Sequence, residues 1–312
     1  MKKVDTKTLF FAGLIISASG FISPPIALTA GILYGLTFAH PYHEDSKKLA
    51  SFLLKASVVG LGFGMNIGEV LRVGRSGFLY TACSIGFSLV MGLAIGKMLL
   101  VRKNSSFLIT TGTAICGGSA IAAVAPILQA GDDEIAVAMG TVFIFNSIAL
   151  LIFPLIGWRL HLSQTQFGLW AALAIHDTSS VVGAASRYGS VALVVGTTVK
   201  LARALWIIPV ALGVAALNKS RSKVKLPWFI LLFCLAAVAN SYLPGFSHIA
   251  KSLSDLGKLG LTATLFLIGT GISRKTLKEV GVRPLLQGVI LWLIVGTSSL
   301  LLIRSGIIAF TH

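Results

Sequence analysis

The sequence predicts an all-α protein, a polytopic membrane protein of about 11 transmembrane helices. Of the 312 residues, 55% are hydrophobic and only 12% are charged, and the mean hydropathy is +0.89. Soluble domains of this size do not have that balance. Apolar runs of spanning length recur along the whole chain, and short loops separate them. One of these runs breaks on glycine at its centre. Together these observations predict a membrane protein with at least one discontinuous helix.

Windows of spanning length give eleven candidate segments, which are 8–22, 24–40, 49–68, 78–101, 106–130, 134–158, 166–187, 190–217, 227–243, 255–273 and 284–308. The first two are short and are separated by the turn Ser23-Pro24-Pro25. The loops leave no room for a soluble domain. We therefore predict a single transmembrane transporter domain over 1–312, with approximate halves at 24–158 and 166–308.

Two pairs of segments within the chain have similar sequences. Gly62–Gly74 echoes Gly269–Gly281, and the spans that carry these segments run in opposite directions in an eleven-span topology. That echo predicts an inverted repeat, a common transporter plan. Ile115–Pro126 echoes Ile175–Ser186, and those two spans run in the same direction. The two echoes cannot belong to one simple repeat.

The net charge of +16 comes from basic residues that cluster in alternate loops. Such clusters mark the cytoplasmic side of a membrane protein. They therefore predict a multi-pass protein of the bacterial inner membrane, with a cytoplasmic N-terminus, rather than a nucleic-acid partner. Arg72 and Arg75 fall on the other side and conflict with the pattern. The clustered residues are Lys2, Lys3, Lys7, Lys47, Lys48, Arg102, Lys103, Arg159, Lys219, Arg221, Lys223, Lys225, Arg274, Lys275, Lys278 and Arg283.

The broken span is 106–130, with Cys116-Gly117-Gly118-Ser119 at its centre. Each half is about 16 Å long, which is half of a ~30 Å hydrocarbon core. A break at that depth is tolerated only where it faces protein or a watery cavity. The N-terminus of the second half carries partial positive charge and free donors, which favour an anion. We predict that backbone groups at these four residues bind a small anion. The Cys116 thiol itself is expected to be a small buried group.

His176 and Asp177 lie near mid-depth in the span 166–187, and Thr178, Ser179 and Ser180 follow them. Ionisable residues at that depth are costly and usually functional. We predict that His176 and Asp177 couple transport to a proton or cation, and that Thr178 and Ser179 contact the substrate. The alternative is a structural network in which Asp177 caps the helical segment that follows.

Lys200 and Arg203 lie in the span 190–217 and share one helix face at positions i and i+3. Both are too far from either end to reach the membrane surface. Two cations there need an anion, which is the substrate, Asp177 or both. Asn146 in the span 134–158 is a further candidate for the same cavity, or for a structural interhelical hydrogen bond. The glycines at 60, 62 and 64 are expected to serve tight helix packing.

With these residues identified, the chain resembles the YeiH-like sulfate exporter family of bacterial inner-membrane proteins. The resemblance covers nearly the whole chain and rests on Gly112–Pro126, on Ile175-His176-Asp177 and on Val199–Arg203. After Asp177 the family usually continues with a Val-Ala-Gln-type stretch, where this chain has Thr178-Ser179-Ser180. The resemblance implies an antiporter/bile-acid-transporter-like fold with two inverted repeats and two crossing helices. It places one crossing helix at 106–130 and leaves the second on 255–273 or on the His176-Asp177 span.

These observations predict a secondary active transporter of a small anion (sulfate-like, sulfonate or carboxylate), working by alternating access and not an enzyme. No P-loop motif occurs, so ATP is not the expected driver. We expect no cofactor, no metal and no nucleic acid. The expected partners are the small anionic substrate, the lipid bilayer, a coupling proton or cation, and a second copy in a homodimer. The alternatives are an anion channel and an intramembrane hydrolase that uses Ser119 or Cys116 with His176 and Asp177.

Overall fold

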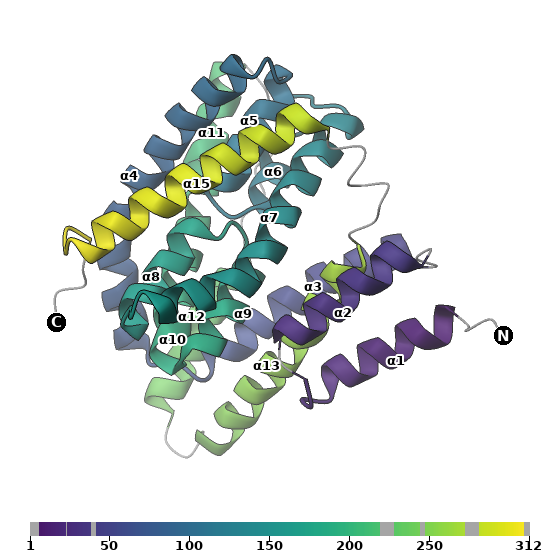
Figure 1. The fold of residues 1–312 in the computed structure, drawn as a ribbon. Helices are drawn as coiled ribbons and strands as arrows, with labels where there is room; N and C mark the ends of the chain where they lie inside the picture. Colours follow the sequence, from purple (N-terminus) through teal and green to yellow (C-terminus); the bar gives the residue numbers. More distant parts are fainter. Residues whose placement is uncertain are drawn as a thin grey trace. The chain divides into compact units, whose positions relative to one another are not determined.

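The computed structural model describes residues 6–22, 24–38, 42–218, 228–243, 247–271 and 281–308, and these residues are helical apart from short turns and connections (Figure 1). The chain divides into two compact units. The first consists of Met1–Val70 and Trp228–Lys275, and the second of Leu71–Pro227 and Thr276–His312. The all-α prediction is confirmed, whereas the single domain with halves at 24–158 and 166–308 stays a prediction.

The first unit is organised around α13, which packs against α1, α2 and α3, while α12 packs against α3. Glycines let these helix backbones approach closely. A Cβ on Gly257 of α13 would lie 2.8 Å from the Ser57 carbonyl oxygen, and one on Gly269 would lie 2.6 Å from the Leu28 carbonyl oxygen. The helices are α1 (Thr6–Ala18), α2 (Pro24–Thr37), α3 (His43–Gly62), α12 (Trp228–Tyr242) and α13 (Ser247–Thr270).

The predicted packing role of the three glycines near the end of α3 is confirmed. A Cβ on Gly60 would lie 3.0 Å from the Gly257 Cα, and one on Gly62 would lie 2.6 Å from the Phe233 carbonyl oxygen. A Cβ on Gly64 would collide with the Ser254 hydroxyl. Small residues of this kind allow close helix contacts in membrane proteins, where the hydrophobic effect does not drive association.

The second unit contains the predicted site. In Figure 1 the yellow helix α15 runs across α5, α7 and α8, and it packs against all three. Helix α10 packs against α8 and α9. The helices of this unit are α4 (Ile67–Met98, of which it holds all but the first residues), α5 (Lys103–Ala114), α6 (Gly118–Val124), α7 (Asp132–Arg159), α8 (Gln164–Ala174), α9 (Thr178–Tyr188), α10 (Ser190–Leu205), α11 (Ile207–Leu217) and α15 (Val282–Arg304).

Four helical segments of the described chain are long and apolar enough to cross a bilayer. They are Val70–Met98, Asp133–Arg159, Ser190–Leu217 and Val282–Arg304, and they coincide with four of the predicted spans. The apolar helices Thr6–Ala18, Ile26–Thr37 and Trp228–Tyr242 are shorter. The full set of eleven spans and the inverted repeat stay predictions.

The predicted start of the fourth span at residue 78 is wrong, because α4 begins at Ile67. Arg72 and Arg75, which the prediction left in a loop, lie within this helix with their side chains exposed. An apolar window discards helical turns that contain arginine, although long basic side chains do not prevent helix formation. Several predicted loop cations lie outside the described residues, namely Lys2, Lys3, Lys219, Arg221, Lys223, Lys225, Arg274, Lys275 and Lys278. So does most of the segment 269–281 that carries one of the echoes.

Two helices are interrupted in the second unit. The predicted break at Cys116-Gly117 is confirmed, since α5 ends at Ala114 and α6 begins at Gly118. The second break separates α8, ending at Ala174, from α9, beginning at Thr178. In contrast, α13 is continuous from Ser247 to Thr270. Of the two positions left open for the second crossing helix, the His176-Asp177 span is interrupted, whereas the expected break of 255–273 lies where the described residues end at Gly271, so that position stays a prediction.

The close approach of α3 and α13 predicts that Gly257→Ala destabilises the first unit. Its new methyl group would lie within 3.0 Å of three backbone atoms of α3, which cannot move as a flexible side chain could. Overpacking of this kind costs about 1–3 kcal/mol. We expect Gly257→Ala to have a lower melting temperature in detergent than the wild-type protein. Size-exclusion chromatography of heated samples measures this temperature. The matched control is Gly213→Ala on α11, which adds the same methyl group where no atom lies within 4 Å. Equal melting temperatures for the two variants would contradict the packing argument.

Candidate functional site

The first break is built on Gly117, whose backbone has φ +67° and ψ −129°. Only glycine adopts this conformation without strain. A Cβ at this position would lie 3.2 Å from the Asp177 Cβ, so the two interrupted helices contact each other at Gly117 and Asp177. The Gly117 N–H donates to the Gly112 carbonyl at 2.8 Å, and therefore this predicted anion donor is already occupied in the structure.

At the second break, Asn146 of α7 satisfies the exposed backbone. Its Oδ1 accepts from the N–H groups of His176 at 3.0 Å and of Asp177 at 3.3 Å. All three residues are at most 7% exposed. The interhelical hydrogen bond that the sequence left as an alternative role for Asn146 is thus present. Without it, two buried N–H groups at the break would lack this acceptor.

Asp177 caps α9. Its Oδ1 accepts from the Ser180 N–H at 2.7 Å, and its Oδ2 accepts from the Ser179 hydroxyl at 3.1 Å. A carboxylate at a helix N-terminus interacts favourably with the positive end of the helix dipole. The capping role that the sequence analysis gave as an alternative for Asp177 is therefore present.

Lys200 of α10 binds the C-terminal end of α8. Its ammonium group donates to the Ile175 carbonyl at 2.7 Å and to the Ala172 carbonyl at 3.3 Å. The Lys200 side chain is fully buried. The last carbonyls of a helix have no intrahelical partner and carry the negative end of its dipole. A buried cation at this place is therefore stabilised by a helix end.

Arg203 joins the ends of both interrupted helices. Its Nε donates to the Ala114 carbonyl at the end of α5, at 2.6 Å. Its Nη1 donates to the Leu173 carbonyl at 2.6 Å and to the Ala172 carbonyl at 3.4 Å, both in the last turn of α8. The guanidinium group presents several donors in a fixed plane, so one buried side chain bridges two helices.

Trp292 of α15 supplies a further donor to the C-terminal end of α8. It was not among the predicted site residues. Its indole N–H donates to the Ala174 carbonyl at 3.1 Å. With Lys200 and Arg203, it gives a side-chain donor to each of the four carbonyls from 172 to 175. Tryptophan in an apolar span carries no sequence signal that separates this role from ordinary packing.

The charged groups of the site are distributed by helix polarity rather than by ion pairing. Among the residues that the structure describes, the ion pairs within 4 Å join Arg102 to Asp133 and Lys258 to Asp255, and neither lies at the breaks. The suggested ion pair of Asp177 with Lys200 or Arg203 is therefore not formed. The cations bind the two C-terminal ends, and the carboxylate binds the N-terminal end of α9.

Several buried polar atoms at the breaks lack a hydrogen-bond partner within the described part of the chain. They are both ring nitrogens of His176, Nδ2 of Asn146 and Nη2 of Arg203. His176 therefore makes no hydrogen bond to Ser119, which an intramembrane hydrolase would need. The Ser119 side chain is exposed, whereas Cys116, Thr178 and the residue after it are buried.

Comparison with known proteins places the chain in one family. The family model described as "Conserved hypothetical protein 698" matches residues 10–288. A UPF0324 membrane protein of Bacteroides thetaiotaomicron is 48% identical over 90% of this chain and 86% of its own length. Relatives with the same family name from Geobacter sulfurreducens and Vibrio vulnificus are 46% and 44% identical, each over 93% of this chain and 94% and 96% of their own lengths. The chain belongs to the UPF0324 family. No solved structure matches it.

Membership of the UPF0324 family confirms the YeiH-like resemblance and agrees with the apolar helices that are long enough to span a bilayer. The relatives carry the name of membrane proteins. For this UPF0324 chain, the interrupted helices therefore belong to a membrane protein, in which free backbone groups at mid-helix require the partners described above.

The bridging role of Arg203 predicts that Arg203→Lys destabilises the second unit. A single ammonium group cannot reach the Ala114 and Leu173 carbonyls with the planar geometry of the guanidinium group, so at least one carbonyl loses its donor. An unsatisfied buried group costs about 1–3 kcal/mol. Thermal unfolding in detergent measures the effect. The control is Arg187→Lys, an exposed arginine at the end of α9. An unchanged melting temperature for Arg203→Lys would contradict the bridge.

Asn146→Ala should also lower stability, because the His176 and Asp177 N–H groups lose their shared acceptor. We expect a loss of about 1–3 kcal/mol. The neighbouring variant Ser147→Ala removes only a hydroxyl that donates to the Phe143 carbonyl of its own helix, and is expected to cost less. Hydrogen exchange of the segment 175–181 would show whether the break itself loosens. Exchange that stays at the level of the Ser147→Ala variant would rule out the proposed role of Asn146.

Proposed function

We propose that this protein is a secondary active transporter of a small anion, working by alternating access in the bacterial inner membrane. The observation that carries the proposal is the contact between two interrupted helices at Gly117 and Asp177, in a chain of a membrane-protein family. Transporters use discontinuous helices to present helix ends to substrates and coupling ions. The sulfate-like, sulfonate and carboxylate anions are the substrate classes that we propose.

The charge of the site supports an anion. Two C-terminal helix ends and two N-terminal helix ends meet there, and their partial charges nearly cancel. The remaining charges are those of Lys200, Arg203 and Asp177, and they leave one net positive charge when all three are ionised. A buried net charge is costly unless a counter-ion is present. A bound anion would supply that counter-ion, whereas a cation would increase the imbalance.

We propose that the anion binds beside the N-terminal ends of α6 and α9. Ser119 is exposed and Gly118 is partly exposed, so both are accessible without rearrangement. The hydroxyls of Thr178 and Ser179 lie at the start of α9 and become available if the Asp177 cap loosens. Nη2 of Arg203 has no partner among the described residues, so it is the donor that remains for an anion while Nε and Nη1 hold the carbonyls.

Asp177 and His176 are the proposed coupling residues. A proton on Asp177 would weaken its acceptance from the Ser180 N–H and the Ser179 hydroxyl, because a neutral carboxyl group is the weaker acceptor. Proton uptake would therefore loosen the cap of α9. His176 has both ring nitrogens free of partners in the described part of the chain, so it can take a proton or bind a water that delivers one.

The proposal also covers the topology, the oligomeric state and the absence of a cofactor. The chain would cross the inner membrane several times with its N-terminus in the cytoplasm, and it would work without a cofactor, without a metal and without enzymatic activity. Two copies would form a homodimer, as many transporters do.

The test is uptake of labelled sulfate, a short sulfonate and a short carboxylate into proteoliposomes, with and without a pH gradient. We expect saturable uptake of one anion, stimulated by the gradient. Lys200→Ala and Arg203→Ala should abolish it. Because these two variants also lose stabilising contacts, the decisive variant is Ser119→Val, whose exposed side chain allows normal folding. It should lower uptake at least tenfold with an unchanged melting temperature, while the exposed variant Arg187→Ala retains wild-type uptake.

Other results of these measurements would contradict the transporter proposal or favour another function. Absence of uptake for every anion, with normal reconstitution, would overturn the proposal. Single-channel currents far above carrier rates would assign an anion channel. Labelling of Ser119 or Cys116 by a serine- or cysteine-directed activity probe would assign an intramembrane hydrolase instead. Wild-type uptake by Ser119→Val and Arg203→Ala together would remove these residues from the site.

A further inference from the structure

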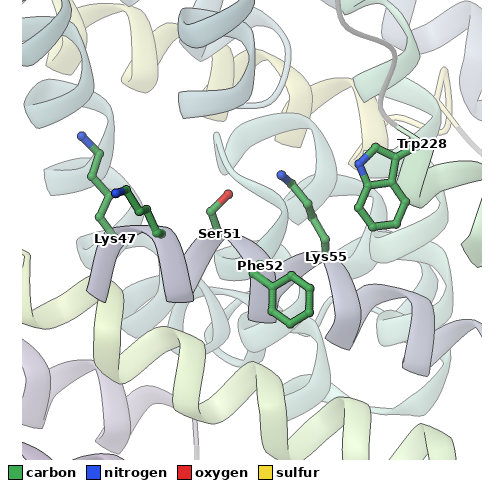
Figure 2. A pocket seen from close by; sticks show the side chains of 6 residues that line it. Lys47, Ser51, Phe52, Lys55 and Trp228 are labelled. Carbon is green, nitrogen blue, oxygen red and sulfur yellow. The ribbon is translucent and has the colours of Figure 1, made fainter. Parts of the chain in front are cut away.

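Three lysines gather in an open pocket of the first unit. The pocket has a volume of about 400 Å³ and is lined by Lys47, Lys48, Ser51, Phe52, Lys55 and Trp228 (Figure 2). Five of these residues belong to α3, and Trp228 is the first residue of α12. The interrupted helices and their proposed substrate site belong to the other unit.

Helical spacing explains why the amines share one side of α3. Lys47, Ser51 and Lys55 are four residues apart, so they follow one another along one helix face. Figure 2 shows the Lys47 and Lys55 amines and the Ser51 hydroxyl extending from the same side of the helix, with the Trp228 ring beside Lys55. The pocket therefore presents several donors to a single ligand.

Among the residues that the structure describes, the pocket has positive charge without a counter-charge. No carboxylate lines it. Among the described residues, none of the three lysines lies within 4 Å of a carboxylate oxygen, although Asp45 is on the same helix. Like charges held together on one helix repel each other. A bound anion would remove this repulsion, and the donors suit the oxygens of a phosphate group.

The aromatic residues favour a lipid as the source of that phosphate. The Phe52 side chain is 62% exposed and the Trp228 side chain is 53% exposed. A soluble anion gains nothing from exposed apolar surface, whereas a phospholipid offers glycerol and acyl carbons next to its phosphate. Tryptophan is enriched at the level of the headgroups in membrane proteins.

We propose that this pocket binds the phosphate headgroup of an anionic phospholipid, such as phosphatidylglycerol or cardiolipin. Basic pockets and polybasic segments beside membrane helices recognise such headgroups. In this assignment the amines of Lys47, Lys48 and Lys55 hold the phosphate oxygens. The rings of Phe52 and Trp228 contact the apolar part of the same lipid. The proposal rests on the membrane location of the protein and not on its substrate.

The test measures lipid binding to the full chain in a neutral detergent by native mass spectrometry, with phosphatidylglycerol and phosphatidylcholine titrated in parallel. We expect bound phosphatidylglycerol at concentrations where phosphatidylcholine does not bind. The variant Lys47→Gln/Lys48→Gln/Lys55→Gln should weaken the binding of phosphatidylglycerol on the order of 100-fold, given the attraction of each lysine to an anionic headgroup. The matched control, Arg72→Gln/Arg75→Gln/Lys97→Gln, removes three exposed cations of α4 and should retain wild-type binding.

Four outcomes would overturn the assignment. Equal affinity of the pocket variant and the wild-type protein for phosphatidylglycerol would remove the lysines from the site. Equal binding of both lipids would show no recognition of charge. Full displacement of phosphatidylglycerol by millimolar inorganic phosphate, or unchanged binding in Phe52→Ser/Trp228→Ser, would assign the pocket to a soluble anion. Because the measurement needs no flux, its failure leaves the transport proposal intact, and an absence of flux leaves this assignment intact.

Discussion

The structure of the second unit depends on one constraint, which is that backbone groups freed by a broken helix need partners where water is scarce. Most of these partners serve the second break, and Arg203 serves both breaks. Asn146 supplies an acceptor to two N–H groups, and Asp177 caps the helix that follows. On the carbonyl side, Lys200, Arg203 and Trp292 supply the donors. The side chains of these five residues therefore contact helix ends, and they tie α7, α10 and α15 to the breaks.

This arrangement shows why structural and functional roles cannot be separated by residue type alone. A buried lysine or aspartate is costly in a membrane and usually marks function. Here the same residues also satisfy helix ends, which lowers the cost of burying them. The two roles meet in a carrier, because a helix end that is held by a side chain can be released when that side chain is protonated or binds a ligand. Within the described part of the chain, the nitrogens at the breaks without a hydrogen-bond partner are those of the His176 ring, Nδ2 of Asn146 and Nη2 of Arg203.

The sequence predicted the all-α class and the break at Cys116-Gly117, and it singled out His176-Asp177 and Lys200 with Arg203, because glycine pairs and charges are rare in apolar spans. It did not predict which atoms these residues contact. The partners of both cations are backbone carbonyls at the ends of α5 and α8. Every residue has a backbone carbonyl, so the residue types in the sequence do not indicate these contacts. Trp292 was missed for the same reason. The start of α4 was placed too late because a hydropathy window excludes turns that contain arginine.

Lys200 and Arg203 differ in residue type because they donate to different sets of backbone carbonyls. Lys200 contacts carbonyls of α8 alone, and a compact ammonium group with three donors is sufficient for one helix end. Arg203 contacts α5 through Nε and α8 through Nη1, so its donors point toward two different helices. Any motion that separates the ends of α5 and α8 must therefore break or exchange a contact of Arg203, whereas Lys200 can move with α8. Arg203 is thus a direct side-chain link between the two interrupted helices, in addition to their contact at Gly117 and Asp177.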